Sequence, residues 1–143
     1  MALHFTSSID IDHSPERVFA LLADVARTPE WLSRCTAVEV LGSDPLTAGT
    51  SLRFTFLQGK KPGAVTGTIT AFEPASRIAF HYGDKLFATT INFSLARTAT
   101  GTRLVETLDI TTHTIAGKLL QPLIRNILAK ALYADLEKLR KLV

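Results

Sequence analysis

Residues 120–139, LQPLIRNILAKALYADLEKL, decide the fold. Apolar residues recur in this stretch at intervals of three and four: Leu120, Leu123, Ile124, Ile127, Leu128, Ala131, Leu132, Leu136 and Leu139. This spacing predicts an amphipathic helix. Pro122 either marks the helix start after Gln121 or kinks a longer helix that begins near Thr114. A helix of about 20 residues is about 30 Å long.

The chain before this helix alternates apolar and polar residues, as do strands of an antiparallel sheet with one wet face. The alternating stretches are residues 3–11, 36–41, 52–56, 65–71, 78–82, 87–95 and 104–110. Turn-forming clusters of Gly, Pro, Asp and Ser separate most of them. We therefore expect a curved antiparallel sheet of about seven strands, with the first strand at an edge. Only the C-terminal helix is long enough to cover its apolar face.

Two short helices are predicted between the first two strands. Ser14 is a suitable cap for a helix that begins at Pro15. Thr28 and Pro29 mark a second start, followed by about two turns. The predicted fold is thus α+β, in a single domain over residues 1–143.

Composition narrows the functional classes. The net charge of +3 is too small to indicate a nucleic-acid partner. Cys35 is the only cysteine, which fits a reducing compartment and excludes an internal disulfide or a paired-cysteine zinc site. Because we find neither a signal-peptide pattern nor about 20 consecutive apolar residues, we expect a cytoplasmic protein.

Basic residues concentrate at the C-terminal end. Residues 113–143 carry six of the 16 Lys and Arg residues and two of the 13 Asp and Glu residues. The other 112 residues therefore carry 10 basic and 11 acidic residues. Cations near the end of a helix complement its dipole. We favour this explanation over a helix that lies on a membrane, and membrane contact is not expected.

The order of elements, with residues 8–11 (SIDI), residues 14–19 (SPERVF), Asp24 and Trp31, resembles the START/Bet v 1-like (SRPBCC) superfamily. It is most similar to the bacterial polyketide cyclase/dehydrase and lipid-transport-like group. Further similar stretches are residues 49–54 (GTSLRF) and residues 73–80 (EPASRIAF). The resemblance implies a helix-grip fold, in which a curved sheet wraps a long C-terminal helix around a cavity. It also implies binding of sterols, lipids, polyketides, hormones or aromatic compounds, with cyclisation or dehydration in some members. No catalytic motif spans the superfamily, so the resemblance transfers no individual residue.

The site itself is predicted from strand register. A two-residue loop at residues 99–100 places Phe93 opposite Glu106, and a turn at residues 84–85 places Tyr82 opposite Phe87. Glu106 and Tyr82 then lie on the apolar face, because a slip by one residue would turn every apolar side chain to solvent.

Glu106 is the candidate catalytic residue. Desolvation raises the pKa of a buried carboxyl, which suits a general acid or base, or a partner for a ligand hydroxyl. The alternatives are an ion pair with an arginine such as Arg53 or Arg103 at the rim of the cavity, or a position at a solvated end of the cavity.

The predicted ligand-binding residues are Trp31, Phe54, Phe56, Phe80, Tyr82, Phe93, Glu106, Ile124 and Leu128. The resemblance places Trp31 at the cavity mouth, although it equally suits a core plug. The phenylalanines line a pocket only if the interior is not filled solid. The histidines are scattered along the chain, so we predict no metal site and no cofactor.

The function favoured by these features is binding of a small hydrophobic molecule, by a carrier or sensor. A cyclase or dehydratase that uses Glu106 is the enzymatic alternative, and lipid transfer at a membrane surface is a third. The sequence leaves a homodimer open.

Overall fold

The computed structural model describes residues 2–84, 87–112 and 121–143. The strands are β1 (Ala2–Ile11), β2 (Cys35–Leu41), β3 (Ser51–Gln58), β4 (Lys61–Glu73), β5 (Arg77–Gly83), β6 (Phe87–Arg97) and β7 (Thr102–Thr112). The helices are α1 (Pro15–Ala23), the 3-10 helix η1 (Val25–Glu30) and α3 (Gln121–Leu142). A start of the last helix near Thr114 lies outside the described residues.

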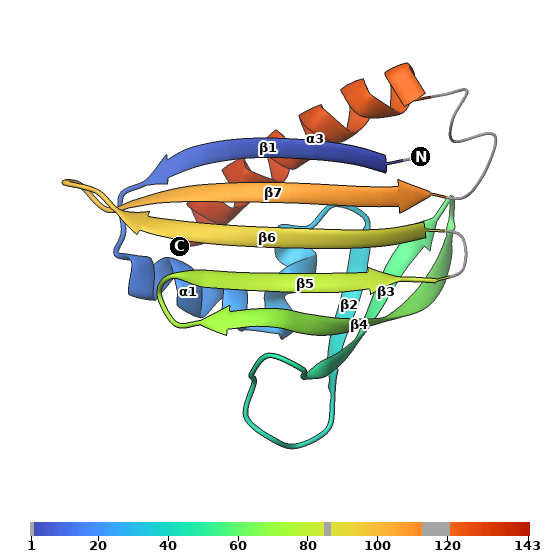
Figure 1. The fold of residues 1–143 in the computed structure, drawn as a ribbon, viewed down its shortest axis with the longest axis horizontal. Coiled ribbons are helices and arrows are strands. Elements are labelled where there is room, and N and C mark those ends of the chain that lie inside the picture. The colour runs from blue at the N-terminus through green and yellow to red at the C-terminus, as the bar shows by residue number, and fades with distance from the viewer. Residues whose placement is uncertain (1, 85–86, 113–120) are drawn as a thin grey trace.

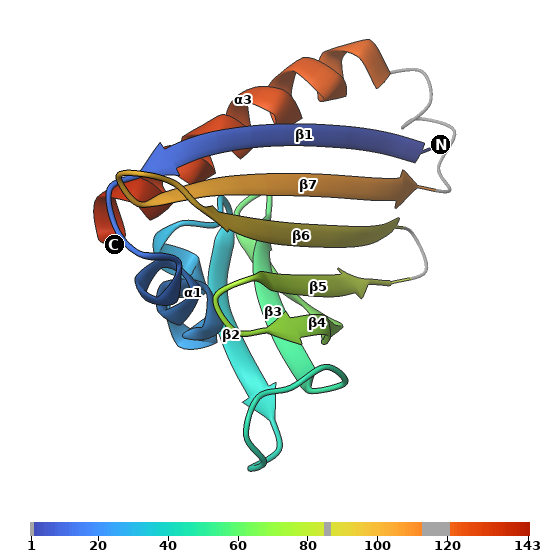
Figure 2. The ribbon, with the colours of Figure 1, turned by 60° about the vertical axis from the view of Figure 1, so that its left-hand side comes forward.

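The seven strands form one antiparallel sheet in the order β1-β7-β6-β5-β4-β3-β2. The sheet curls so that β2 and β3 turn behind β5 and β6, and α3 runs behind β1 and β7 (Figures 1 and 2). As predicted, β1 lies at an edge of the sheet, where its one neighbour is β7, the last strand of the chain. The α+β helix-grip architecture expected from the sequence is confirmed.

Alternation along the strands builds the core. In β1 the side chains of Leu3, Phe5, Ile9 and Ile11 are buried, whereas the outward positions between them carry polar residues. The outward face carries exposed ion pairs such as Asp10–Arg103, which contribute little to stability because water and salt screen them. Apolar burial on the inner face is therefore the main source of stability.

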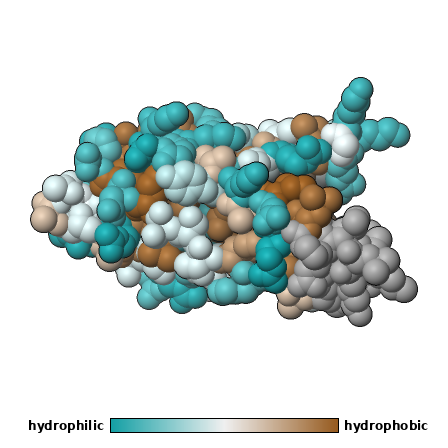
Figure 3. Space-filling model, turned by 90° about the horizontal axis from the view of Figure 1, so that it is seen from above, coloured by the Kyte–Doolittle hydropathy of each residue, from teal (hydrophilic) through white to brown (hydrophobic). Residues whose placement is uncertain are grey.

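Helix α3 is held mainly by its C-terminal half. Leu132, Leu136 and Leu139 are buried in the core, whereas Leu123 and Ile127 are 59% and 58% exposed. Figure 3 looks onto the α3 side of the molecule and shows an apolar area within a mostly hydrophilic surface. Arg140 and Lys141 lie in the last turn of α3, where positive charge complements the helix dipole.

The predicted strand registers are partly correct. Phe93 pairs with Glu106, as expected. The predicted pairing of Tyr82 with Phe87 is wrong, because Tyr82 pairs with Thr89. The backbone N–H of Asp84 donates to the carbonyl of Phe87 (2.9 Å), so the two strands close one residue further along the chain than predicted, and the register shifts by two. Since side chains alternate with period two, a shift of two residues leaves Tyr82 on the inner face.

Of the two predicted helix caps, one is correct and one is wrong. Ser14 caps α1, and its Oγ accepts a hydrogen bond from the backbone N–H of Arg17 (3.3 Å). Thr28 is not a cap, because η1 begins at Val25 and contains Pro29. The chain turns tightly as soon as α1 ends, and the N–H of Arg27 donates to the Asp24 carbonyl (2.9 Å), the short-range bond typical of a 3-10 turn.

A glycine at the β6–β7 turn allows the end of β1 to pass close by. A Cβ atom at Gly101 would lie 2.1 Å from the carbonyl oxygen of Ile11 and 2.7 Å from the backbone nitrogen of His13. Because both are backbone atoms, we expect Gly101→Ala to lower the free energy of unfolding by about 2 kcal/mol or more, measured by urea denaturation.

Gly63→Ala is the matched control. A Cβ there would meet only the flexible end of the Gln58 side chain, 2.9 Å away, so we expect a change within about 0.5 kcal/mol. Equal stabilities for the two variants would contradict the close approach at Gly101.

Candidate functional site

A cavity of about 220 Å³ lies between the sheet and α3. The sheet contributes Phe56, Tyr82, Thr89, Ile91, Glu106, Leu108 and Ile110 to its wall. Helix α3 contributes Ile127, Leu128, Ala131, Leu132 and Asp135, and the segment before β2 contributes Leu32, Ser33 and Arg34. Most of these side chains are apolar, with a few polar groups among them, as is usual for sites that bind small molecules.

The cavity adjoins a second hollow of about 310 Å³ near the β3–β4 hairpin. The two share Ser33, Arg34, Phe56, Tyr82, Thr89 and Ile110 in their walls. Arg34 connects the segment before β2 to the β3–β4 hairpin, because its guanidinium donates to the carbonyl oxygens of Leu57 (3.1 Å) and Gly59 (3.0 Å). The two hollows therefore lie side by side, and the second one lies next to the β3–β4 hairpin.

Glu106 lies in the middle of β7, with its carboxyl inside the molecule. Its neighbours across the sheet are Phe93 on β6 and Ser7 on β1. The residue is only 1% exposed, and its Oε2 atom has no hydrogen-bond partner among the described residues. Burial, aided by the nearby charge of Asp135, raises the pKa of Glu106 to about 9. The carboxyl is therefore neutral at pH 7.

The alternative ion pair of Glu106 with an arginine does not form. Arg53 pairs with Glu39 at 3.4 Å, and Arg103 pairs with Asp10 at 3.0 Å. Both arginines are exposed, as are their carboxylate partners. Glu106 is thus left on the inner face without a basic partner from either of them.

Asp135 of α3 is a second buried carboxyl in the cavity wall, and it is 5% exposed. Its Oδ1 accepts a hydrogen bond from the Ser33 hydroxyl (2.5 Å), and its Oδ2 accepts from the Ser33 backbone N–H (3.4 Å). Burial raises the pKa of Asp135, while the hydrogen bonds from Ser33 oppose the rise. The sequence prediction missed Asp135, although it is a charged residue at helical spacing from Leu128, Leu132 and Leu139 on the apolar stripe.

Tyr82 packs among aromatic rings at the boundary between the two hollows. Its ring centroid lies 4.7 Å from that of Phe54 and 5.1 Å from that of Phe56. The hydroxyl shares a hydrogen bond with Thr89, its partner across the sheet, and burial raises the pKa of the phenol. Tyr82 is thus a neutral polar group at the cavity wall. Thr89 was also missed, although it is a polar residue on the apolar parity of β6.

The structure brings some of the predicted ligand-binding residues together and not others. Phe56, Tyr82, Glu106 and Leu128 line the 220 Å³ cavity. Trp31, Phe54, Phe80 and Phe93 are buried but are not among its lining residues. The side chain of Ile124 lies outside the described part of the chain.

Trp31 occupies the core beside the sheet. It is 1% exposed, and its ring meets that of Phe93 edge to face, with centroids 5.4 Å apart. Its indole Nε1 has no hydrogen-bond partner among the described residues. This placement matches the core-plug alternative more closely than the cavity mouth.

The structure also bears on a cysteine nucleophile, on a metal site and on a membrane-spanning helix. Burial raises the pKa of the Cys35 thiol to about 11, so the thiolate needed for a nucleophile does not form near pH 7. Within residues 2–84, 87–112 and 121–143, no three His, Cys, Asp or Glu side chains gather as metal ligands would. Over the same ranges, no helix has the length and hydropathy needed to cross a membrane.

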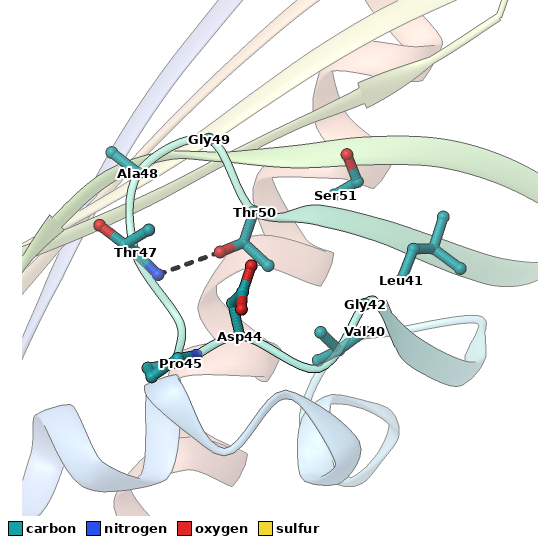
Figure 4. A pocket seen from close by; sticks show the side chains of 10 residues that line it. All are labelled: Val40, Leu41, Gly42, Asp44, Pro45, Thr47, Ala48, Gly49, Thr50 and Ser51. Carbon is teal, nitrogen blue, oxygen red and sulfur yellow. Dashed lines mark hydrogen bonds between the residues drawn. The ribbon is translucent and has the colours of Figure 1, made fainter.

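A further hollow of about 330 Å³ belongs to the β2–β3 connection alone (Figure 4). All its lining residues come from one stretch, residues 40–51, and the Thr47 N–H donates to the Thr50 hydroxyl (3.0 Å) within it. None of the residues that line the carboxyl-bearing cavity contributes to this hollow. It is the concave side of a loop, with no buried charged group.

A curved sheet closed by a C-terminal helix over an internal cavity defines a START/Bet v 1-like protein with the helix-grip fold. The profile of the family described as "Polyketide cyclase / dehydrase and lipid transport" matches residues 2–143, and the chain belongs to this family. The family and fold are those of hydrophobic-ligand-binding and polyketide-cyclase-type proteins. Comparison with curated proteins gave no match.

Solved structures share the fold at low sequence identity. A START superfamily protein from Mycobacterium smegmatis superimposes with a TM-score of 0.80 at 14% identity, covering 98% of this chain and 96% of that one. The Zhui aromatase/cyclase from a Streptomyces species gives 0.79 at 16% identity, covering 99% and 93%. TTHA0849 from Thermus thermophilus gives 0.76 at 21% identity, covering 99% and 95%.

The buried carboxyl predicts a pH-dependent stability. The pKa of Glu106 is about 9 in the folded protein, against an ordinary value of 4.5. Between these values the unfolded chain releases a proton that the folded protein keeps, so the contribution of Glu106 to stability falls as pH rises. We therefore expect the free energy of unfolding of Glu106→Gln, relative to that of the wild type, to rise by up to about 1.4 kcal/mol per pH unit in this window.

The measurement is the free energy of unfolding of both proteins in urea, at pH values from about 5 to about 8. Asp135 titrates in both proteins, so the difference between their free energies of unfolding reports the ionisation of Glu106. Curves that run parallel across the window would show that Glu106 ionises in the folded protein as readily as in the unfolded chain.

Proposed function

We propose that the protein binds a small apolar molecule in the cavity between the sheet and α3, as a carrier or sensor. The observation that carries this proposal is a hollow interior that holds a buried carboxyl without a partner. A solidly packed core would leave no space of this size beside the carboxyl.

The cavity, together with the hollow that it adjoins, has room for a ligand of one to three aromatic rings, or a short acyl chain. An apolar cavity of about 150 Å³ is sufficient for benzene. This cavity measures about 220 Å³ and adjoins the second hollow. Burial of the ligand's apolar surface would provide affinity at roughly 25 cal/mol per Å², before the costs of binding.

The polar groups in the wall would orient the ligand. A neutral Glu106 donates one hydrogen bond through its hydroxyl and accepts through its other oxygen. The hydroxyl of Tyr82 lies in the same wall. A ligand with one polar end and an apolar body satisfies both features of the cavity.

Filling the cavity tests this proposal. Ala131 of α3 lines the cavity, whereas Ala134 is exposed on the same helix. We expect Ala131→Phe to weaken binding of the neutral fluorescent probe N-phenyl-1-naphthylamine at least about tenfold, because the added ring takes the ligand's space. Ala134→Phe should leave binding within about twofold. Equal binding by the two variants, or no binding by the wild type, would contradict the proposal.

An enzyme of the cyclase or dehydratase type is the second candidate. The observation in its favour is that two carboxyls with unlike surroundings line one cavity: Asp135 accepts hydrogen bonds from Ser33, whereas Glu106 is neutral and has an unpartnered oxygen. Environments that separate two pKa values are typical of acid–base pairs. In this role Glu106 would donate a proton while the cavity excludes water.

Glu106→Gln separates catalysis from binding. If the protein is an enzyme, we expect this variant to lose turnover of a linear polyketide mimic at least about 100-fold, because glutamine cannot transfer the proton. Its binding of N-phenyl-1-naphthylamine should stay within about threefold. Tyr82→Phe is the matched control for loss of a polar group in the same wall. Unchanged turnover in the glutamine variant would exclude Glu106 as the acid.

A further inference from the structure

The inner cavity carries two acidic groups on facing elements. Glu106 comes from β7 and Asp135 from α3, and both line the same 220 Å³ space. The cation in this wall is Arg34, whose guanidinium is already bonded to the carbonyls of Leu57 and Gly59. Lys138 lies one turn beyond Asp135 and is exposed. Within the described chain, neither carboxyl forms an ion pair.

A second observation indicates that a ligand completes this arrangement. The Oε2 atom of Glu106 is fully buried and has no hydrogen-bond partner among the described residues. Buried polar atoms in folded proteins nearly always have a partner, so an exception calls for a missing one. The space beside Glu106 is a cavity, so a bound molecule can supply the missing group.

We propose that the ligand of this cavity is an apolar amine, with its protonated nitrogen between Glu106 and Asp135 and its apolar body against the sheet and α3. This inference rests on the proposed function, because it names the chemical class of ligand for the same cavity.

An ammonium group matches the available acceptors. It has three N–H donors and no acceptor. Glu106 Oε2 lacks a donor, and the carboxylate of Asp135 can accept more bonds than the two it receives from Ser33. The hydroxyl oxygen of Tyr82, in the same wall, is a third acceptor. A carboxylate ligand would instead add negative charge to two acidic groups.

Binding of a cation should release a proton. In the free protein Glu106 is neutral at pH 7, and a cation beside it favours the ionised form. The other titratable groups near this wall are Tyr82 and Cys35, and burial raises both of their pKa values, so neither ionises near neutral pH. Arg34 stays charged throughout. Proton release near pH 7.5 therefore reports on Glu106 and Asp135, and amine affinity should increase from about pH 6 to about pH 8.

Three naphthalenes that differ only in their polar group provide the test: 2-naphthylmethylamine, 2-naphthylmethanol and 2-naphthoate. Titration calorimetry near pH 7.5, in two buffers of unlike ionisation enthalpy, gives both affinity and proton release. We expect the amine to bind at least about tenfold more tightly than the alcohol, with proton release, and the carboxylate to bind most weakly.

Two variants and one control locate the effect. Glu106→Gln should reduce amine affinity at least about tenfold and reduce the number of protons released, while alcohol affinity stays within about threefold. Asp135→Asn should also reduce the preference for the amine over the alcohol. This variant tests the same site if Glu106→Gln fails to fold. Glu137→Gln removes the same charge from α3, where Glu137 is paired with Arg140, and should change nothing.

The outcomes separate this inference from the proposed function. If the alcohol binds and the amine binds no more tightly, the amine assignment is wrong and apolar ligand binding stands. If the preference for the amine survives in both carboxyl variants, the assigned site is wrong. If none of the three compounds binds, the proposed function fails together with the inference.

Discussion

Helix α3 closes the concave apolar face of a seven-stranded sheet, and it is anchored in the core by its C-terminal half. Leu132, Leu136 and Leu139 are buried against the inside of the sheet, whereas Leu123 and Ile127, nearer the start of α3, are largely exposed. Under the middle of the helix, from Ile127 to Asp135, the space between the layers stays open as a cavity of about 220 Å³. The shape of the site thus follows from where the helix is anchored.

The same geometry explains the chemistry of the site. Because the strands alternate, Glu106 has to face inward with its neighbours Phe93 and Leu104, and the sheet offers it no cation. Desolvation then keeps the carboxyl neutral near pH 7. Such a group weakens the fold as pH rises, so its presence is better explained by a role in the cavity than by stability.

Much of the fold could be predicted from local sequence pattern. Period-two alternation located the strands, and spacing of three and four located the last helix. A short turn at residues 99–100 was enough to predict the pairing of Phe93 with Glu106, and with it a carboxyl on the inner face. Local rules failed at two connections: β5 and β6 close one residue further along than the Gly-Asp sequence indicated, and η1 forms a 3-10 turn instead of a capped α-helix.

The site was harder to predict than the fold. Which aromatic rings fill the core and which line the cavity depends on how α3 is seated, and no strand pattern contains that information. Phe56 therefore lines the space, whereas Phe54 and Phe80 are buried without lining it. Asp135 was overlooked for a different reason: the apolar stripe of α3 is defined by its leucines, and an acidic residue at the same spacing does not stand out as part of it.

The central claim is that Glu106 lies neutral in a hollow that a ligand can enter. Its most direct test is an NMR titration of the Glu106 side-chain carboxyl carbon, in the free protein and with saturating N-phenyl-1-naphthylamine. We predict a midpoint near 9 in the free protein and a changed chemical shift on addition of the probe. An ordinary midpoint near 4.5, or a carboxyl resonance that does not respond to the probe, would contradict this account.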